Sequence, residues 1–309
     1  MKKRRTNLKL SDCWLYALAS PADLARRLAT PKHPIKVVEF TNLAKDTGNF
    51  RLFLQTNAAG KSRQIQEPKR RLQWIHGKIH ALLSRVEVPD YLHSAVRGRS
   101  YISNAAAHDP SMPMLKIDVK NFFASVPRVA IFKFFEGPMK CRRDVAGLLA
   151  DMLTFETHLP TGSAASPIIA FYAFKPMFDE IEQFALAHGL KMTCYVDDMA
   201  LSGPRANKAA LFEVRKIIAR HGLKSHKARV FAATQPKVLT GVCNTPAGPR
   251  VPNKLHLKIK TGFENLSSAK TLDARNEVLR PLLGRLEAAG QIDPTFRARA
   301  RTVRTAHSK

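Results

Sequence analysis

The chain has 309 residues, 45% of them hydrophobic, which excludes wholesale disorder and allows one large domain or two smaller ones. Its charge is unusual, because 51 Lys and Arg against 24 Asp and Glu give a net charge of +27. Such an excess destabilises a compact state unless a polyanion neutralises it, so nucleic acid is the expected partner. The charge is spread along the chain, which disfavours an anionic membrane surface. No run of 18 apolar residues is present, so no membrane-spanning helix is expected.

The four cysteines, Cys13, Cys141, Cys194 and Cys243, lie far apart and form no CxxC pair. This spacing gives no support to a zinc ribbon and favours free thiols in a reducing cytosol. The basic start followed by a short apolar run imitates a secretory signal peptide, but the run is too short. We therefore expect a cytoplasmic protein.

The first third of the chain carries helix, hairpin and helix signals in that order. Residues 1–30 are expected to be helical, with Ser11 or Asp12 capping a short amphipathic helix, and 31–34 to form a proline break. The alternating segment 49–56 and the returning segment 61–68 predict a β-hairpin. The spacing of apolar residues over 72–86 predicts a helix.

The remaining two thirds mix strands and helices. Segment 112–119 predicts a strand, 128–135 and 142–155 predict helices, and 163–186 predicts one long helix opened by small residues. A hairpin around 197–198 follows, then a helix over 207–221, strands over 228–233 and 237–242, and basic helices from 252 onward. No regular βαβ alternation is present, so the expected fold class is α+β with an antiparallel sheet.

Asp197 and Asp198 stand side by side in CYVDDMALS, between two short apolar runs that predict strands. A two-residue turn would hold both carboxylates at one end of a sheet, where their charges repel each other. A divalent cation would relieve this repulsion, since Mg²⁺ prefers oxygen ligands. The alternative is an ordinary polar hairpin turn with no catalytic role.

A third carboxylate, Asp118, ends the apolar strand in LKIDVKNFF. If this strand lies beside the hairpin, Asp118 comes opposite Asp197. Three such carboxylates suit two Mg²⁺ ions about 3.5–4 Å apart, the arrangement used for in-line phosphoryl displacement. One ion would lower the pKa of an attacking 3′-hydroxyl, and the other would neutralise the leaving pyrophosphate.

Several segments resemble, in order along the chain, the motifs of reverse transcriptases. They are the fingers segment GKSRQIQEPKRRLQWI at 60–75, the first palm strand KIDVKNFF at 116–123, the loop-helix motif LPTGSAASP at 159–167, the palm hairpin YVDD at 195–198 and the lysine motif GLKSHKARV at 222–230. NAAAH at 104–108 and LTG at 239–241 resemble marks of the retron subgroup. Thr161 stands where the family usually has glutamine, and Val196 where retron enzymes commonly have alanine.

The resemblance implies a retron-type bacterial reverse transcriptase with a right-hand polymerase fold, which has helical fingers, an antiparallel palm sheet and a small helical thumb. It implies an N-terminal helical segment at 1–48, fingers at 49–110, a palm at 111–235 with interleaved fingers elements, and an RNA-binding connection and thumb at 236–309.

The resemblance also implies roles for single residues. The expected catalytic residues are Asp118, Asp197 and Asp198, as ligands of two Mg²⁺ ions, and Lys227, which would protonate pyrophosphate or neutralise a phosphate. The expected substrate-binding residues are Lys61 and Arg63 at the triphosphate, Phe123 as a ring that excludes a 2′-hydroxyl, and Thr161 and Gly162. Solvated charge is the alternative for Lys61 and Arg63, and a core position is the alternative for Phe123.

Five further residues are RNA-binding candidates: Arg97, Arg99, Asn104, His108 and Thr240. The two arginines could contact backbone phosphates. Asn104 and His108 stand four residues apart, on one face if helical, and either hold the fold by hydrogen bonds or contact RNA.

The implied function is to copy a cognate structured noncoding RNA, from a guanosine 2′-hydroxyl, into RNA-linked multicopy single-stranded DNA. The implied substrates are dNTPs, and the implied setting is antiphage defence with a separate effector protein. One alternative is another bacterial reverse transcriptase, group II intron-like or defence-associated, that makes unbranched cDNA. The second is a noncatalytic RNA-binding scaffold.

Overall fold

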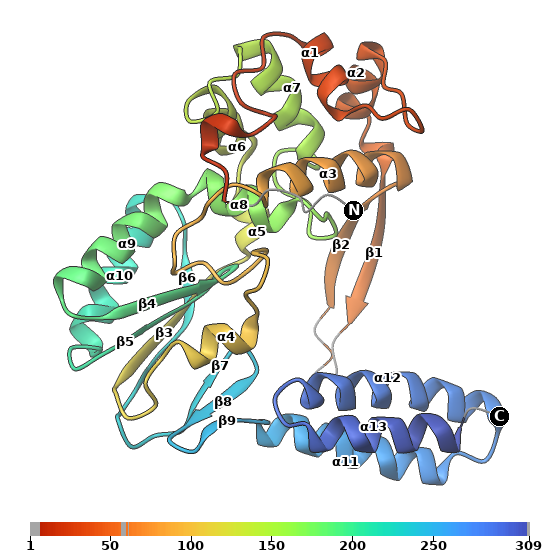
Figure 1. Ribbon diagram of the computed structural model, residues 1–309, viewed down its shortest axis with the longest axis vertical. Coiled ribbons are helices and arrows are strands. Elements are labelled where there is room, and N and C mark those ends of the chain that lie inside the picture. The colour runs from red at the N-terminus through yellow and green to blue at the C-terminus, as the bar shows by residue number, and fades with distance from the viewer. Residues whose placement is uncertain (1–6, 57–59, 61, 308–309) are drawn as a thin grey trace.

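The computed structural model describes residues 7–56, 60 and 62–307 (Figure 1). The N-terminal region differs from the single helical stretch expected over 1–30. A 3-10 turn at Leu10–Asp12 is followed by turns, and α1 (Pro21–Leu28) begins only after Ser20, whose Oγ accepts a hydrogen bond from the Asp23 N–H at 3.1 Å. Ala17 has φ +50°, a left-handed conformation that no helix continues through. Ser20 and not Ser11 or Asp12 is therefore the effective cap of the first α-helix.

The next elements form the upper part of the molecule and the long hairpin that descends from it in Figure 1. They are α2 (Val37–Lys45), a 3-10 turn at Thr47–Asn49, β1 (Phe50–Thr56), β2 (Ser62–Pro68) and α3 (Arg70–Leu83). β1 and β2 pair antiparallel, from Phe50 with Pro68 to Thr56 with Ser62, so the predicted hairpin is confirmed. The predicted helix after it is also confirmed, because α3 buries apolar side chains at helical spacing.

The central sheet has the order β4-β5-β3-β6, and every neighbouring pair is antiparallel. Its strands are β3 (Met114–Val119), β4 (Lys191–Tyr195), β5 (Asp198–Ser202) and β6 (Ser225–Phe231). Helices α9 (Lys175–Ala187) and α10 (Lys208–Arg220) lie along one face of this sheet, and the short α4 (Tyr101–Ala106) lies at the other (Figure 1). The expected α+β class with an antiparallel sheet is therefore observed.

Four helices connect this sheet to the upper region: α5 (Phe122–Ser125), α6 (Arg128–Glu136), α7 (Arg143–Leu153) and α8 (Ser166–Ala173). The single helix predicted over 163–186 is wrong, because α8 ends before Phe174 and α9 starts at Lys175. Pro176 occupies the first turn of α9. Proline lacks the N–H that would continue the α8 hydrogen-bond ladder, so the chain starts a new helix there.

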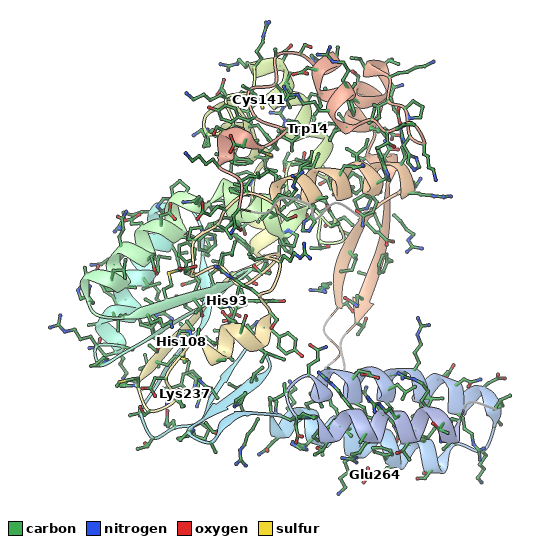
Figure 2. The ribbon with its side chains drawn as sticks, viewed as in Figure 1. Trp14, His93, His108, Cys141, Lys237 and Glu264 are labelled. Atoms are coloured by element: carbon green, nitrogen blue, oxygen red, sulfur yellow. The ribbon has the colours of Figure 1, made fainter. Side chains whose placement is uncertain are left out.

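The strand predicted over 237–242 is instead a hairpin of β7 (Lys237–Leu239) and β8 (Val242–Thr245), extended by β9 (Gly248–Arg250). Thr240 and Gly241 form the turn with φ +47° and +86°, as a type I′ turn requires. Lys237, the first residue of β7, is fully buried (Figure 2) and donates hydrogen bonds to three backbone carbonyls, those of Pro110, Ala233 and Gln235.

The C-terminal residues form a three-helix bundle of α11 (Asn253–Ser268), α12 (Leu272–Gly290) and α13 (Thr295–Ala306), which lies below the strands β1 and β2 in Figure 1. The bundle has its own core, in which Leu282 and Leu286 are buried. The Tyr101 hydroxyl of α4 donates a hydrogen bond to Gln291 Oε1 at 3.1 Å and ties the bundle to the central sheet. None of the helices within the described residues has both the length and the apolar character that crossing a bilayer demands.

Candidate polymerase active site

The alternation of β3 places its charged side chains on one face of the sheet. Leu115, Ile117 and Val119 point into the core that the helices cover, and all three are buried. Because neighbouring side chains alternate along a strand, Lys116 and Asp118 point to the opposite face. This face of the sheet therefore carries the acidic side chain of Asp118 and the basic side chain of Lys116 together, next to β5.

Asp118 and Asp198 are direct partners in the β3–β5 register. Tyr195 pairs with Asp198 across the hairpin, so the turn consists of Val196 and Asp197. This differs from the expectation that the turn holds both aspartates, because Asp198 is the first residue of β5. The Val119 N–H donates to the Asp197 carbonyl at 3.1 Å and holds the turn against β3. Tertiary structure thus brings the three predicted acids to one end of the sheet.

Val196 has φ +63°, an uncommon conformation for a β-branched residue. The Val196 N–H donates a hydrogen bond to the Ser94 Oγ at 2.9 Å, from a loop remote in sequence. Residues held in sparsely populated backbone regions persist only where their surroundings enforce them, and such residues cluster at functional sites. Ser94, which the sequence patterns did not indicate, therefore supports the turn that carries Asp197.

Lys227 occupies a β-bulge in β6. Lys116 pairs with Arg229 but Asp118 pairs with His226, so β6 contains one extra residue between these pairs. Lys227 has φ +48° and directs its Nζ to Asp118 Oδ2 at 3.2 Å. A bulge re-aims a side chain, and here it turns the predicted catalytic lysine toward a predicted catalytic carboxylate.

Burial and mutual repulsion change how the acids titrate. Burial raises the pKa of Asp197, and the neighbouring Asp118 charge raises it further. Burial also raises the pKa of Asp198 to about 6, although Lys116 opposes the shift from 2.7 Å at Oδ2. The site therefore favours a cationic partner for these carboxylates.

The donor chemistry of the acids fits a divalent metal ion. Asp118 Oδ1 and Asp198 Oδ1 are buried and, among the described residues, have no hydrogen-bond partner. Hard carboxylate oxygens of this kind are the ligands that Mg²⁺ prefers. Within the described part of the chain, however, no three His, Cys, Asp or Glu side chains meet closely enough to hold one ion. Lys227 and Lys116 instead pair with the Oδ2 atoms of Asp118 and Asp198.

The loop that carries Thr161 and Gly162 packs on β2. Gln66 Oε1 accepts hydrogen bonds from the Thr161 N–H at 3.1 Å and from the Thr161 Oγ1 at 3.2 Å. The Gly162 N–H donates to the Gln66 carbonyl at 3.0 Å. The structure therefore places Thr161 and Gly162 against the base of the β1–β2 hairpin, and it shows a role for Gln66 that its sequence position did not indicate.

Gly162 is expected to tolerate no side chain. A Cβ there would lie 2.8 Å from the Gln66 carbonyl oxygen and from Glu67 Cα, both backbone atoms. Gly162→Ala should therefore lower the free energy of unfolding by about 1–3 kcal/mol, measured by denaturant titration. Gly77→Ala is the control, because a Cβ at that helical position meets nothing within 4 Å and should stabilise by roughly 0.5–1 kcal/mol. Equal stability of the two variants would contradict the close-approach argument.

The other substrate-binding candidates are placed as follows. Lys61 lies outside the described residues. Arg63 is exposed on β2 and donates to Gln55 Oε1 at 3.0 Å. Phe122 is buried, as expected of a core ring, whereas Phe123 is only partly buried beside it. A ring that is partly open at the end of β3 is compatible with contact to a nucleotide, and the role of Phe123 stays a prediction.

Asn104 and His108 are buried, which favours the hydrogen-bonding alternative for them, and their contact with RNA stays a prediction. The His108 ring lies 2.7 Å from Ser202 Oγ and 2.8 Å from Thr193 Oγ1, so it bridges β5 and β4 (Figure 2). The Asn104 amide donates to Thr240 Oγ1 at 3.3 Å. This network joins the segment of α4 to the β4–β5 hairpin on one side and to the β7–β8 turn on the other.

Arg99 holds the loop before α4. Its guanidinium donates to the carbonyls of Pro89, Asp90 and Leu92 at 2.7–3.1 Å and to the Asp90 carboxylate at 2.8 Å. These bonds give Arg99 a structural role, and its contact with a backbone phosphate stays a prediction. Arg97 is exposed and remains a predicted RNA contact.

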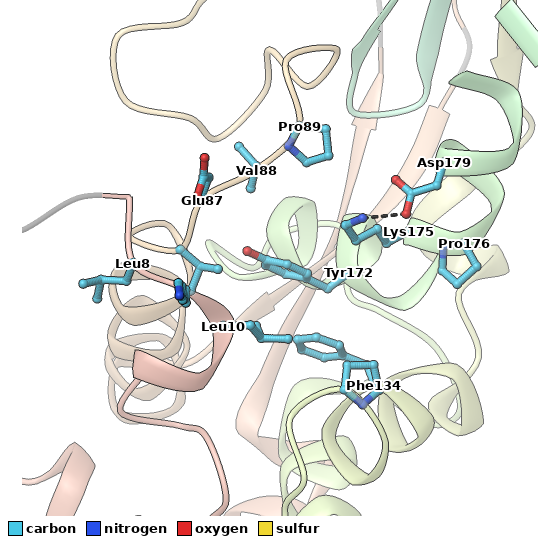
Figure 3. Close-up of a pocket in the computed structure, with 13 residues that line it drawn as sticks. Leu8, Leu10, Glu87, Val88, Pro89, Phe134, Tyr172, Lys175, Pro176 and Asp179 are labelled. Atoms are coloured by element: carbon cyan, nitrogen blue, oxygen red, sulfur yellow. Dashed lines mark hydrogen bonds and ion pairs between the residues drawn. The ribbon is translucent and has the colours of Figure 1, made fainter. Parts of the chain in front are cut away.

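A separate pocket of about 550 Å³ lies between the N-terminal segment, the loop at 86–89 and helices α6, α8 and α9 (Figure 3). Tyr172 stacks on Phe134 in its wall, and Lys175 pairs with Asp179 at its edge. None of the predicted catalytic or substrate-binding residues that the structure describes lines this pocket. The candidate site is therefore the end of the central sheet.

Lys116 is the charged residue that the sequence patterns missed at this site. The signal was present, because strand alternation puts a residue two positions before Asp118 on the same face. Only the fold, which pairs β3 with β5, shows that its partner is Asp198.

Comparisons with known proteins identify the family. A family model described as reverse transcriptase (RNA-dependent DNA polymerase) matches residues 43–242. The chain is 31% identical over 153 residues to the Retron Se72 reverse transcriptase of Salmonella heidelberg (strain 579083-10), covering 49% of this chain and 40% of that protein. It is 24% identical over 261 residues to the Retron Ec48 reverse transcriptase of Escherichia coli, covering 74% and 64%. The chain thus spans less than two thirds of the length of each of these curated relatives.

The chain is also similar to a solved structure of the foamy viral protease-reverse transcriptase in complex with double-stranded DNA, with a TM-score of 0.50. The two are 17% identical, and the match covers 83% of this chain and 38% of that one. That likeness concerns the fold alone and confirms the expected polymerase architecture. The curated relatives confirm the predicted resemblance to retron-type enzymes. The chain belongs to the reverse transcriptase (RNA-dependent DNA polymerase) family.

Proposed function

We propose that this chain is a retron reverse transcriptase that copies a cognate noncoding RNA into single-stranded DNA. The observation that carries the proposal is the pairing of Asp118 with Asp198 at the end of the central sheet, with Asp197 in the adjoining turn. Buried, unpartnered carboxylate oxygens in a chain of net charge +27 fit a site that binds cations inside a polyanion-binding protein.

In this proposal Asp118, Asp197 and Asp198 would hold two Mg²⁺ ions, which activate a primer hydroxyl and neutralise the departing pyrophosphate. Lys227 would stand beside the leaving phosphates, supported by its position on the bulge near Asp118. Thr161 and Gly162 would position the nucleotide from the loop packed on β2. Lys61, Arg63 and Arg97 keep their proposed roles as contacts to phosphates.

The proposed product is RNA-linked multicopy DNA that begins at a guanosine 2′-hydroxyl, made within an antiphage system that includes a separate effector protein. The names of the curated relatives support the retron type. We also propose the division into an N-terminal segment, fingers, palm and thumb. The separate core of the C-terminal bundle supports the thumb.

The product of the purified chain tests this function. The chain is incubated with the transcript encoded beside its gene, dNTPs and Mg²⁺, and the DNA is analysed before and after ribonuclease treatment and debranching. Branched, RNA-linked DNA is the expected result. Unbranched cDNA would point to another type of bacterial reverse transcriptase. If the chain makes no DNA on any primed RNA template, the result would favour a noncatalytic RNA-binding scaffold.

Phe123→Ala is expected to relax sugar selection. If the partly open Phe123 ring lies under the sugar, its removal makes room for a 2′-hydroxyl and raises the use of rNTPs relative to dNTPs by roughly 10- to 100-fold. Single-nucleotide extension rates on a primed RNA template measure this ratio. Phe132→Ala, the same change in a partly buried ring on α6, is the control. An unchanged ratio in Phe123→Ala would assign Phe123 to packing alone.

A further inference from the structure

Lys116 is a charged residue at the site to which neither the family resemblance nor the proposed chemistry assigns a role. It lies on β3 two residues before Asp118, and its Nζ is 2.7 Å from Asp198 Oδ2. Its position is set by the sheet and not by a flexible loop. A strand of six residues, paired on both sides, holds its backbone.

The register explains why Lys116 reaches Asp198. Lys116 lies opposite Ala200, and Asp118 lies opposite Asp198, so Lys116 and Asp198 are diagonal neighbours on one face. Diagonal neighbours are within reach of a long side chain. Ala200, the direct partner of Lys116 in the register, carries only a methyl group. The ion pair therefore follows from the sheet geometry.

The Lys116–Asp198 pair differs from the neighbouring Lys227–Asp118 pair in its burial. The Lys116 and Asp198 side chains are only 22% and 17% exposed, whereas Lys227 is 71% exposed and lies 3.2 Å from Asp118 Oδ2. Water and salt screen the exposed pair strongly and the half-buried pair much less. Of the two lysines, Lys116 therefore exerts the stronger influence on the carboxylates.

We propose that Lys116 is a positioning residue that competes with the metal ion for Asp198 and thereby weakens metal binding. The inference rests on the proposed function. An ion that binds Asp198 has to share the carboxylate with a half-buried ammonium or displace it. The same ammonium holds Asp198 Oδ2 and leaves Asp198 Oδ1 buried and, among the described residues, without a hydrogen-bond partner.

Metal affinity of the full chain tests this inference without any measurement of activity. Binding of Mn²⁺ is followed by isothermal titration calorimetry, with the Mn²⁺-dependent rise of the thermal midpoint as a second readout. Lys116→Gln is expected to bind Mn²⁺ roughly tenfold more tightly, because it removes a nearby unit charge and frees Asp198. Lys116→Arg keeps the charge and the pair and should stay within about twofold of the unsubstituted chain.

Lys120→Gln is the matched control. It makes the same change of charge at an exposed position two residues after Asp118, where solvent screens the effect. In a chain that already carries Asp198→Asn, Lys116→Gln should raise the Mn²⁺ affinity no more than Lys120→Gln does. The reason is that Lys116 then has no carboxylate at position 198 to pair with. If the Lys116→Gln variant does not fold, the same measurement is made on Lys116→Met, which removes the charge but keeps an apolar side chain of similar length.

Two results overturn the proposal in distinguishable ways. If Lys116→Gln binds Mn²⁺ no more tightly than Lys120→Gln does, the proposed role of Lys116 is wrong, and the proposed metal site is unaffected. Absence of Mn²⁺ binding by the unsubstituted chain sinks the two-metal proposal, and the inference falls with it.

Discussion

Asp118→Asn is expected to lower the rate of DNA synthesis by at least roughly 10³-fold. Asparagine has nearly the shape of aspartate but removes one of the charges that would hold the metal ions, whose electrostatic stabilisation of a phosphoryl transition state is worth several kcal/mol. Asp118 pairs with Asp198 in the sheet and faces Lys227 at 3.2 Å, so its substitution affects the centre of the site. Incorporation of the first dNTP on a primed RNA template, in Mg²⁺, measures the rate.

The control is Asp144→Asn, the same chemical change at an exposed position in the first turn of α7. It should leave the synthesis rate within about twofold. Circular dichroism and RNA binding should be unchanged in Asp118→Asn, so that the loss is one of chemistry and not of folding. Asp197→Asn is expected to behave in the same way. Retention of a tenth or more of the rate in either variant would exclude these carboxylates as metal ligands for catalysis.

The second large effect concerns His108 and acid stability. His108 is buried between Ser202 and Thr193. Burial, followed by the charges of Lys191 and His93, lowers the pKa of His108 to about 3. Above the unfolded-state value near 6.5 both states are neutral, and the contribution of His108 to stability is fully present. As the pH falls below 6.5, His108 takes up a proton in the unfolded chain but stays neutral in the folded chain. The free energy of unfolding therefore decreases, by about 3 kcal/mol at pH 4.5.

His108→Gln isolates this effect, because glutamine does not titrate. At pH 7.5 the variant should be less stable than the unsubstituted chain by about 2 kcal/mol, through imperfect hydrogen bonding of Ser202 and Thr193. At pH 4.5 the difference should vanish or reverse. Denaturant unfolding of both proteins at both pH values measures it. His76, whose pKa burial lowers to about 4, titrates in both proteins and cancels in the comparison. A difference that stays constant between the two pH values would contradict the buried, neutral His108.

The buried hydrogen bonds of Asn104 and His108 have one physical cause. A polar residue in a sequence looks the same whether it faces solvent or a buried partner, and only packing decides between the two. In this fold α4 lies on the sheet face opposite α9 and α10, so Asn104 of α4 meets Thr240, and His108, just after α4, meets Ser202 and Thr193. A polar network of this kind is costly to leave incomplete, which suits it to fix the β4–β5 hairpin relative to the β7–β8 turn.

Local patterns in the sequence were sufficient for the β1–β2 hairpin, the helix after it, the strand that carries Asp118 and the helical character of the chain after residue 252, because periodicity and turn residues act over short distances. They also indicated the three acids and the +27 charge, and the resemblance of the motifs to reverse transcriptases supplied the polymerase. Only the tertiary structure decided that Asp118 faces Asp198, that a bulge turns Lys227 toward Asp118 and that Lys116 pairs with Asp198. Strand order and register join residues far apart in the chain, and they depend on how the whole core packs, which no local pattern contains.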